Sequence, residues 1–223
     1  MNELTNVRPT LPVSTDFLIP ERLGRRPWSQ KHKAPIPWFV ETVNGEPDFR
    51  VVKTARMFDA IDKRLCWICG ERLGQHMAFN LGPISAINRM SSEPPGHKEC
   101  ALYSAQACPF LSHPNKDRRT AGLPDEIEPG PGMPILHNPG VTLVWLTKGY
   151  KAEIHERTKL LFAIGDPHEL YWFAEGRAAT RIEVEAAINK GLPILQELAA
   201  QDGPAAMAEL AARLDQARTL LPR

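Results

Sequence analysis

The chain has 223 residues, of which 43% are hydrophobic, and its formal net charge is +1. This length is enough for one full hydrophobic core, or for one core with an appended module. The near-neutral charge excludes a global field that would steer the protein toward nucleic acid or an anionic membrane. Because no apolar run approaches roughly 20 residues, a membrane span is excluded as well.

Residues 1–34 lack apolar periodicity, and we expect an extended basic arm there. The segment 22–33 contains no acidic residue but holds five basic residues and a tryptophan, namely Arg22, Arg25, Arg26, Trp28, Lys31 and Lys33. Basic side chains around an aromatic ring are suited to contact phosphates and to stack on bases, so nucleic acid is one candidate partner. The alternative is a solvated basic tail whose tryptophan packs on the body of the protein.

A zinc-containing α+β core is expected over residues 35–175. Residues 37–53 predict a β-hairpin, because strand-forming residues flank Asn44-Gly45, a strong turn signal. A short helix over 54–64 should follow. Three further strands are predicted over 141–146, 160–164 and 170–173. They should join the hairpin in a small antiparallel or mixed sheet, and its faces should be filled by Trp145, Phe162, Trp172 and Phe173.

All four cysteines lie within residues 66–108. Two pairs with the same internal spacing make a four-ligand set, and these are Cys66, Cys69, His97 and Cys100. The pairs are separated by 27 residues, which is typical of a structural zinc site. Four protein ligands leave no coordination position for water, so we expect a structural Zn²⁺ rather than a catalytic one.

Two alternatives to this zinc site stay open, namely buried cysteines without a metal and disulfide bonds. We read no signal peptide at the start of the chain and expect a cytoplasmic protein, where such spacing favours metal over disulfide. Cys108 would stand two helical turns beyond Cys100. We read it as a core thiol, with replacement of His97 as a ligand as the alternative.

The segment between the ligand pairs is expected to form two short strands, 76–79 and 84–87, that turn at Leu81-Gly82-Pro83. A helix over 97–107 would then carry the second pair. A zinc knuckle followed by a hairpin and a helix resembles a treble-clef zinc module. The pattern CxxCG…SSEPPxHxxCA…ACPF and its flanking segments also resemble proteins of bacterial and phage genomes, a likeness that carries no activity with it.

Residues 176–223 are expected to form a C-terminal helical segment. Thr180 and Glu183 match a capping box, and Gly191 is the predicted stop of the first helix. Two more helices are predicted over 192–201 and 204–221. The loop over 112–139 has no assigned role. Glu175 and Arg177 flank a strand-to-helix turn, where we favour a local ion pair over an anion site.

The sequence favours a small intracellular zinc-stabilised binding or adaptor protein, with a protein as its partner. One alternative is non-enzymatic binding of nucleic acid through the basic arm. The other is a metal-dependent nuclease resembling the HNH type, with His76 as general base and Asn88 as orienting residue. In that case the Asp-His pair of the family is missing, because Gln75 precedes His76. We therefore expect a non-enzyme.

Overall fold

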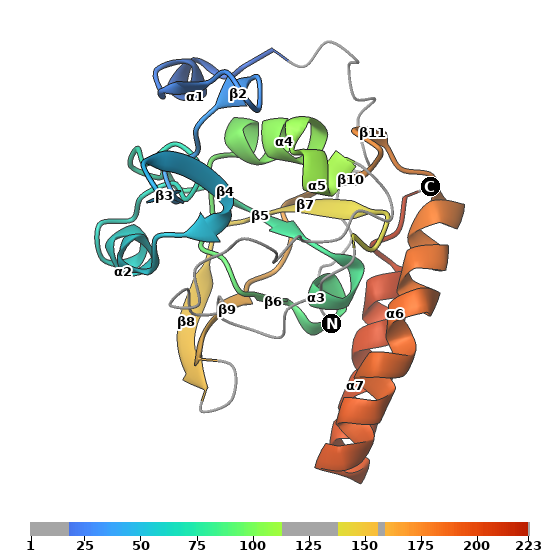
Figure 1. The fold of residues 1–223 in the computed structure, drawn as a ribbon. Coiled ribbons are helices and arrows are strands. Elements are labelled where there is room, and N and C mark those ends of the chain that lie inside the picture. The colour runs from blue at the N-terminus through green and yellow to red at the C-terminus, as the bar shows by residue number, and fades with distance from the viewer. Residues whose placement is uncertain (1–17, 113–137, 156–158, 223) are drawn as a thin grey trace.

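The computed structural model describes residues 18–112, 138–155 and 159–222. Among these residues the fold is α+β, with small sheets whose strand pairs are all antiparallel, as predicted. Figure 1 shows the sheets in the body of the molecule and two long C-terminal helices along one side. None of the described helices is both long enough and apolar enough to cross a membrane.

A four-stranded sheet forms the centre of the body, in the order β11-β10-β7-β5. Its strands are β5 (Met77–Leu81), β7 (Thr142–Thr147), β10 (Glu169–Ala174) and β11 (Arg177–Ala178). Every residue of β7 is buried, as expected for a strand covered on both faces. The predicted aromatic filling is confirmed, because at most 3% of the surface of Trp145, Phe162, Trp172 and Phe173 is exposed.

A three-stranded sheet in the order β6-β9-β8 lies beside the central one. Its strands are β6 (Met90–Ser91), β8 (Tyr150–His155) and β9 (Lys159–Ile164). The prediction of β9 is confirmed, whereas β8 was not predicted. Phe162 of β9 enters the same hydrophobic cluster as Trp145 of β7, so the two sheets share a core.

The predicted hairpin is present as β3 (Val40–Val43) and β4 (Glu46–Val52). Asn44 and Gly45 have φ angles of 51° and 83°, as a two-residue turn of this kind requires. The hairpin does not join the other strands, however, and forms a sheet of its own. Helix α2 (Thr54–Asp62) follows as predicted and buries Met57 and Ala60 in the main core.

The segment 18–34 is not extended, so that expectation is wrong for the part of the arm that the structure describes. It forms helix α1 (Glu21–Gly24) and the strands β1 (Trp28–Ser29) and β2 (Ala34–Pro35). The reason is that Leu23, which is only 2% exposed, packs into a hydrophobic cluster with the cysteine pairs. Residues 1–17 lie outside the described residues, and so does nearly all of the loop predicted over 112–139.

The second strand predicted between the ligand pairs is wrong. Residues 84–87 belong to helix α3 (Pro83–Asn88), with Gly82 as N-cap and Pro83 at its first position. Proline is favoured there because the first helical N–H needs no partner within the helix. As a result β5 has no hairpin partner in this segment, and it pairs instead with β7.

Helix α4 (Lys98–Ala107) confirms the helix predicted after the second ligand pair, and α5 (Pro109–Ser112) follows it. In Figure 1, α4 lies across the central sheet. Its buried side chains are Cys100, Ala101 and Ala105, and they pack in one cluster with Val144 of β7 and Phe173 of β10.

The C-terminal segment forms α6 (Arg181–Asp202) and α7 (Pro204–Arg218). The capping box of Thr180 and Glu183 is present as predicted. The predicted stop at Gly191 is wrong, because α6 continues through it. Gly191 instead permits close packing on α3, since a Cβ there would lie 2.4 Å from Cδ1 of Ile84.

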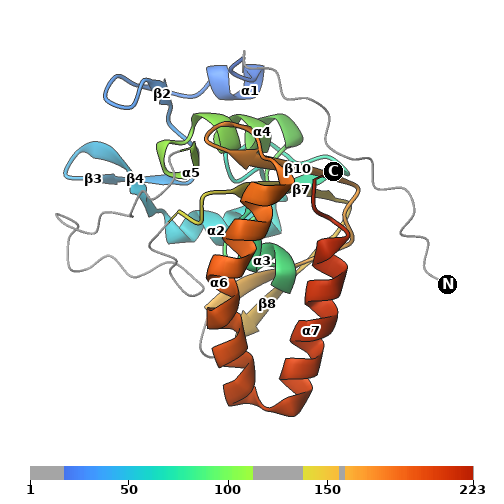
Figure 2. The ribbon, with the colours of Figure 1, turned by 90° about the vertical axis from the view of Figure 1, so that its right-hand side faces the viewer.

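The two long helices form an antiparallel hairpin that extends beyond the body (Figure 2). Leu195 and Ala199 of α6, Leu210 of α7 and Ile87 of α3 make a separate hydrophobic cluster. Val184 and Ala187, near the start of α6, belong to the main core instead. The domain boundaries between residues 34 and 35 and between residues 175 and 176 are not tested by these contacts and stay a prediction.

Candidate metal centre

The first ligand pair lies in a tight turn that its own backbone closes. The N–H of Cys66 donates to the carbonyl oxygen of Glu71 at 2.7 Å, and the N–H of Gly70 donates to that of Cys66 at 2.8 Å. Gly70 has a φ angle of 82°, in the left-handed region that favours glycine. This turn is the knuckle that the Cys-x-x-Cys-Gly sequence predicts.

The segment that enters the β3–β4 hairpin supports the knuckle from one side. The N–H of Trp38 donates to the carbonyl oxygen of Ile68 at 2.7 Å. The indole ring of Trp38 covers Gly70 so closely that a Cβ on this glycine would lie 2.6 Å from two ring carbons. The glycine is therefore required both by its backbone angle and by the ring above it.

The second ligand pair lies at the beginning of α4. His97 is the N-cap residue, and Cys100 lies in the first turn. Just before them, Gly96 exchanges two backbone hydrogen bonds with Ala78 of β5, each 2.8 Å long. The edge of the central sheet thus holds the start of α4 against the knuckle, and the N–H of His97 donates to Sγ of Cys66 at 3.3 Å.

The structure brings all four predicted ligands together. Their ligand atoms lie within 4.8 Å of one another, and all four residues are buried, namely Cys66, Cys69, His97 and Cys100. A tetrahedral zinc site with Zn–S bonds of about 2.3 Å has sulfur atoms about 3.8 Å apart, so the cluster is of the right size. Three soft thiolates and one imidazole also form a common donor set for structural zinc. The residues fit this metal.

The hydrogen bonds of His97 leave one ring nitrogen for the metal. Nε2 lies 3.0 Å from the carbonyl oxygen of Arg72, and Nδ1 lies 3.4 Å from Sγ of Cys69. Because a carbonyl can only accept, Nε2 must carry the proton, and the lone pair of Nδ1 then points into the cysteine cluster. A backbone carbonyl that orients a ligating histidine in this way is the usual arrangement around protein-bound zinc.

Hydrogen bonds within the cluster shift the pKa values of three of its members. Burial alone would raise the pKa of the Cys66 thiol, but hydrogen bonds from Cys100, Cys69 and the backbone N–H of His97 lower it to about 3. The hydrogen bond to Cys69 raises the pKa of His97. The hydrogen bond to Cys66 likewise raises the pKa of Cys100. The groups share protons because several buried negative charges would otherwise repel, and a metal ion can replace those protons.

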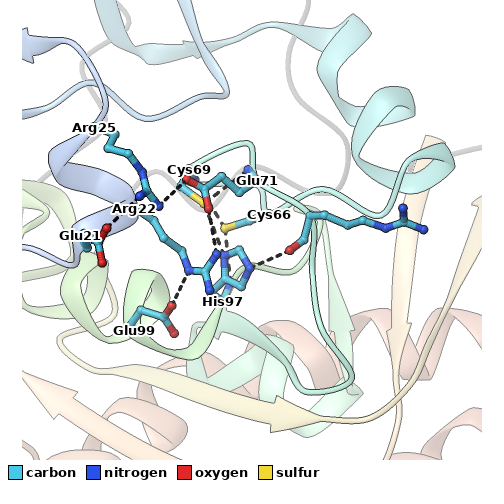
Figure 3. Close-up of polar contacts among 9 residues, drawn as sticks. Glu21, Arg22, Arg25, Cys66, Cys69, Glu71, His97 and Glu99 are labelled. Carbon is cyan, nitrogen blue, oxygen red and sulfur yellow. Dashed lines mark hydrogen bonds and ion pairs between the residues drawn. The ribbon is translucent and has the colours of Figure 1, made fainter.

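A network of ion pairs lies over the site and was not predicted from the sequence (Figure 3). Arg22 of α1 donates from Nη1 to Glu71 at 2.8 Å and from Nε to Glu99 at 2.9 Å. Arg25 donates to Glu71 at 3.0 Å and to Glu21 at 2.8 Å. Glu71 follows the knuckle and Glu99 precedes Cys100, so Arg22 bridges the two ligand pairs. The only sequence signal is that Glu71 stands two residues after Cys69 and Glu99 directly before Cys100.

Cys108 lies outside the four-ligand cluster, at the C-cap of α4. It is half-buried rather than part of the core clusters, so the expected core thiol is not confirmed.

The members of the predicted basic arm lie in different surroundings. Arg22 and Arg25 are held by the acidic residues around the metal centre, and Arg26 donates to the carbonyl oxygen of Ile36. The side chain of Trp28 is 46% exposed. Lys31 and Lys33 lie in the turn between β1 and β2.

The residues considered for catalysis are not assembled around the cluster. The ring of His76 stacks on that of His168, with centroids 4.8 Å apart. Asn88 ends α3, and its carbonyl oxygen accepts a hydrogen bond from Arg213. The HNH-type reading also requires a hairpin between the ligand pairs, and α3 stands in that place. Within residues 18–112, 138–155 and 159–222, His76 and Asn88 are thus not brought together at the four-residue cluster.

The turn before α6 is fixed by a local ion pair, as predicted. Arg177 donates to Glu183 at 2.6 Å and lies 3.8 Å from Glu175. The guanidinium of Arg177 and the backbone N–H of Thr180 lower the pKa of Glu183 to about 2. The charges of Arg177 and Glu183 neutralise each other, so this turn offers no free anion site.

Comparison of the chain with models of protein families, with curated proteins and with solved structures gave no match. The function must therefore be argued from the geometry.

Proposed function

We propose that this chain is a small intracellular binding or adaptor protein in which a structural zinc ion orders the surface that meets a protein partner. The observation that carries the proposal is the buried Cys66, Cys69, His97 and Cys100 cluster, which is of a size and donor type that suits zinc. The cluster lies where α1, the knuckle, the edge of β5 and α4 meet. A metal at this point would join the knuckle to the start of α4, and α1 and β5 pack against that junction.

A structural role is favoured over a catalytic one by the number of ligands. Three thiolates and one imidazole complete a tetrahedral zinc site, and no position then remains for a water or a substrate. The site is also closed from outside, since at most 7% of the surface of any ligand residue is exposed. An open position would require the loss of a ligand.

Metal analysis of the purified protein tests the proposal. We expect one equivalent of zinc per chain after purification without chelator. A zinc content well below half an equivalent, in protein that is folded by circular dichroism, would contradict it. Substitution by Co²⁺ adds a spectroscopic check, because a tetrahedral Cys₃His site gives intense thiolate charge-transfer bands.

A further inference from the structure

Two arginine side chains bind the same short segment beside the candidate metal centre. Nε of Arg26 donates to the carbonyl oxygen of Ile36 at 3.1 Å. Nη1 of Arg56, from α2, donates to that of Val40 at 3.4 Å. Both guanidinium groups thus lie on the same short segment, residues 36–40. Within the described parts of the chain, no acidic side chain forms an ion pair with either of them.

Arg26 and Arg56 are near enough for the charge of one to act on the other. Burial lowers the pKa of Arg26, and the charge of Arg56 lowers it further. A half-buried pair of like charges is costly unless an anion joins them.

Nearby acidic residues already have their own partners. Lys53 lies 3.7 Å from Glu41, and Arg50 holds Asp48 at 2.5 Å. These pairs cancel within the β3–β4 hairpin. The two arginines therefore keep a net positive charge on this face of a nearly neutral protein.

Aromatic and basic side chains continue the face. The guanidinium of Arg56 lies over the ring of Trp38 at 5.3 Å, which fixes its orientation. The β1–β2 hairpin carries the half-exposed Trp28, and Lys31 and Lys33 lie in its turn. The ring of His32 in the same turn packs against that of Phe49 of β4, with centroids 4.3 Å apart and the ring planes tilted by 38°. Figures 1 and 2 both show the two hairpins on the same side of the molecule.

We propose that Arg26 and Arg56 bind a backbone phosphate of a single-stranded nucleic acid, with a neighbouring base stacked on Trp28 and further phosphates at Lys31 and Lys33. Guanidinium groups bind phosphate oxygens in pairs, and an exposed indole accepts any base. A series of positive charges along one hairpin suits a polymer with repeated phosphates better than a single phosphorylated side chain. This inference goes beyond the proposed protein partner and rests on one part of the proposed function, the zinc that orders the knuckle beneath Trp38.

Fluorescence polarisation with a labelled 20-nucleotide oligo(dT) tests the inference on the zinc-loaded full chain. Wild-type protein should bind, and its affinity should fall as salt rises. The double variant Arg26→Gln/Arg56→Gln should bind at least about 10-fold more weakly, and its log–log salt slope should be smaller by about 0.7, because the pair neutralises one phosphate. Trp28→Ala should weaken binding about five-fold or more without changing the slope.

Arg181→Gln/Arg218→Gln is the matched control, because it also removes two arginine charges, but from exposed positions on α6 and α7. Its affinity should stay within about two-fold of wild type. The inference is overturned if wild type does not bind the oligonucleotide, if both double variants lose affinity equally, or if a phosphoserine peptide binds while the oligonucleotide does not. The zinc content of each sample separates these failures from failure of the proposed function, which would appear as folded protein without zinc.

Discussion

Two of the candidate ligands, His97 and Cys66, are held by contacts that do not depend on a metal. The imidazole of His97 is oriented by the carbonyl oxygen of Arg72. Sγ of Cys66 accepts hydrogen bonds from the N–H groups of Cys69 and His97. Such contacts place the donor atoms before binding and so reduce the ordering that the metal must impose. Cys108 shares none of these contacts with the cluster.

Exchange of single cysteines should therefore separate the ligands from the remaining thiol. Cys69→Ser should lose the zinc, because a buried serine is a poor replacement for a thiolate. Cys108→Ser should keep about one equivalent, because Cys108 lies outside the cluster. Zinc content of both variants, measured on folded protein, checks this. Equal loss of zinc in the two variants would show that the ligand assignment is wrong.

Gly70 offers a second test at the scale of one residue. Gly70→Ala adds a methyl group at a φ angle of 82°, against the ring of Trp38. We expect the free energy of unfolding to fall by about 1–2 kcal/mol because of the strained backbone and by about 1–3 kcal/mol more because of overpacking. Thermal melting of the zinc-loaded protein measures it.

Gly45→Ala is the control for Gly70→Ala, since Gly45 has nearly the same φ angle, 83°, and nothing within 4 Å of its added Cβ. It should show only the backbone cost. If both variants melt at the same temperature, the close contact between Trp38 and the knuckle has no energetic weight.

At the scale of elements, α1 is a clamp over the metal centre. It anchors Leu23 in the core around the cysteines, and Arg22 bridges Glu71 and Glu99. These ion pairs are partly exposed, so each contributes only about 0–1 kcal/mol to stability. Their effect should appear in the rate at which the site opens rather than in the melting temperature.

We expect Arg22→Gln to transfer zinc to a chromogenic chelator about two- to five-fold faster than wild type, which corresponds to a loss of about 0.5–1 kcal/mol of closing free energy. Its melting temperature should change by only a few degrees. Arg218→Gln, which removes one exposed arginine from α7, should release zinc at the wild-type rate. An unchanged rate in Arg22→Gln would mean that α1 does not control access to the metal.

The sequence predicts best those elements whose signals are local. The ligand set follows from two short spacings, the first hairpin from Asn44-Gly45, and the start of α6 from Thr180 and Glu183. Residues 84–87 were assigned wrongly because a four-residue apolar run fits a strand or a helix equally well. There the decision rests on Pro83 at the first helical position and on the packing of α6 and α7 against α3.

Long-range contacts account for what the sequence could not show. Arg22 is 49 residues from Glu71 and 77 from Glu99, and only the folded position of α1 brings them together. Gly191 looks like a helix stop, yet it serves as a contact surface for Ile84. The proximity of Arg26 and Arg56 depends in the same way on the path of residues 36–40.

At the scale of the whole molecule, the metal centre and the central sheet share one hydrophobic cluster. Cys66, Cys69 and Cys100 pack in it with Val144 of β7 and Phe173 of β10. Trp67, between the two knuckle cysteines, packs in the main core, which contains Trp145 and Phe162. The knuckle therefore contacts both main parts of the core, and its loss should not stay local.

We predict that a strong chelator lowers the melting temperature of the chain by more than about 10 °C. Structural zinc contributes on the order of 10 kcal/mol of binding free energy, which rivals the typical stability of about 5–15 kcal/mol for a whole domain. A loss of even about 4 kcal/mol would shift the melting temperature of a chain of this length by about 10 °C. Trp67, which is 2% exposed, should become accessible to water, so tryptophan fluorescence and far-UV circular dichroism should report the change together.

The cluster of α6 and α7 with α3 contains no zinc ligand, and its buried members are Ile87, Leu195, Ala199 and Leu210. Part of the helical signal should therefore remain after chelation, while the fluorescence of Trp67 shifts completely. Acid should act as the chelator does, because protons compete with the metal for the thiolates. Return of zinc should restore the original melt, which separates metal loss from damage. If verified zinc removal left both signals and the melting temperature unchanged, the metal would be peripheral to the fold, and the proposed ordering of the partner surface by zinc would fail with it.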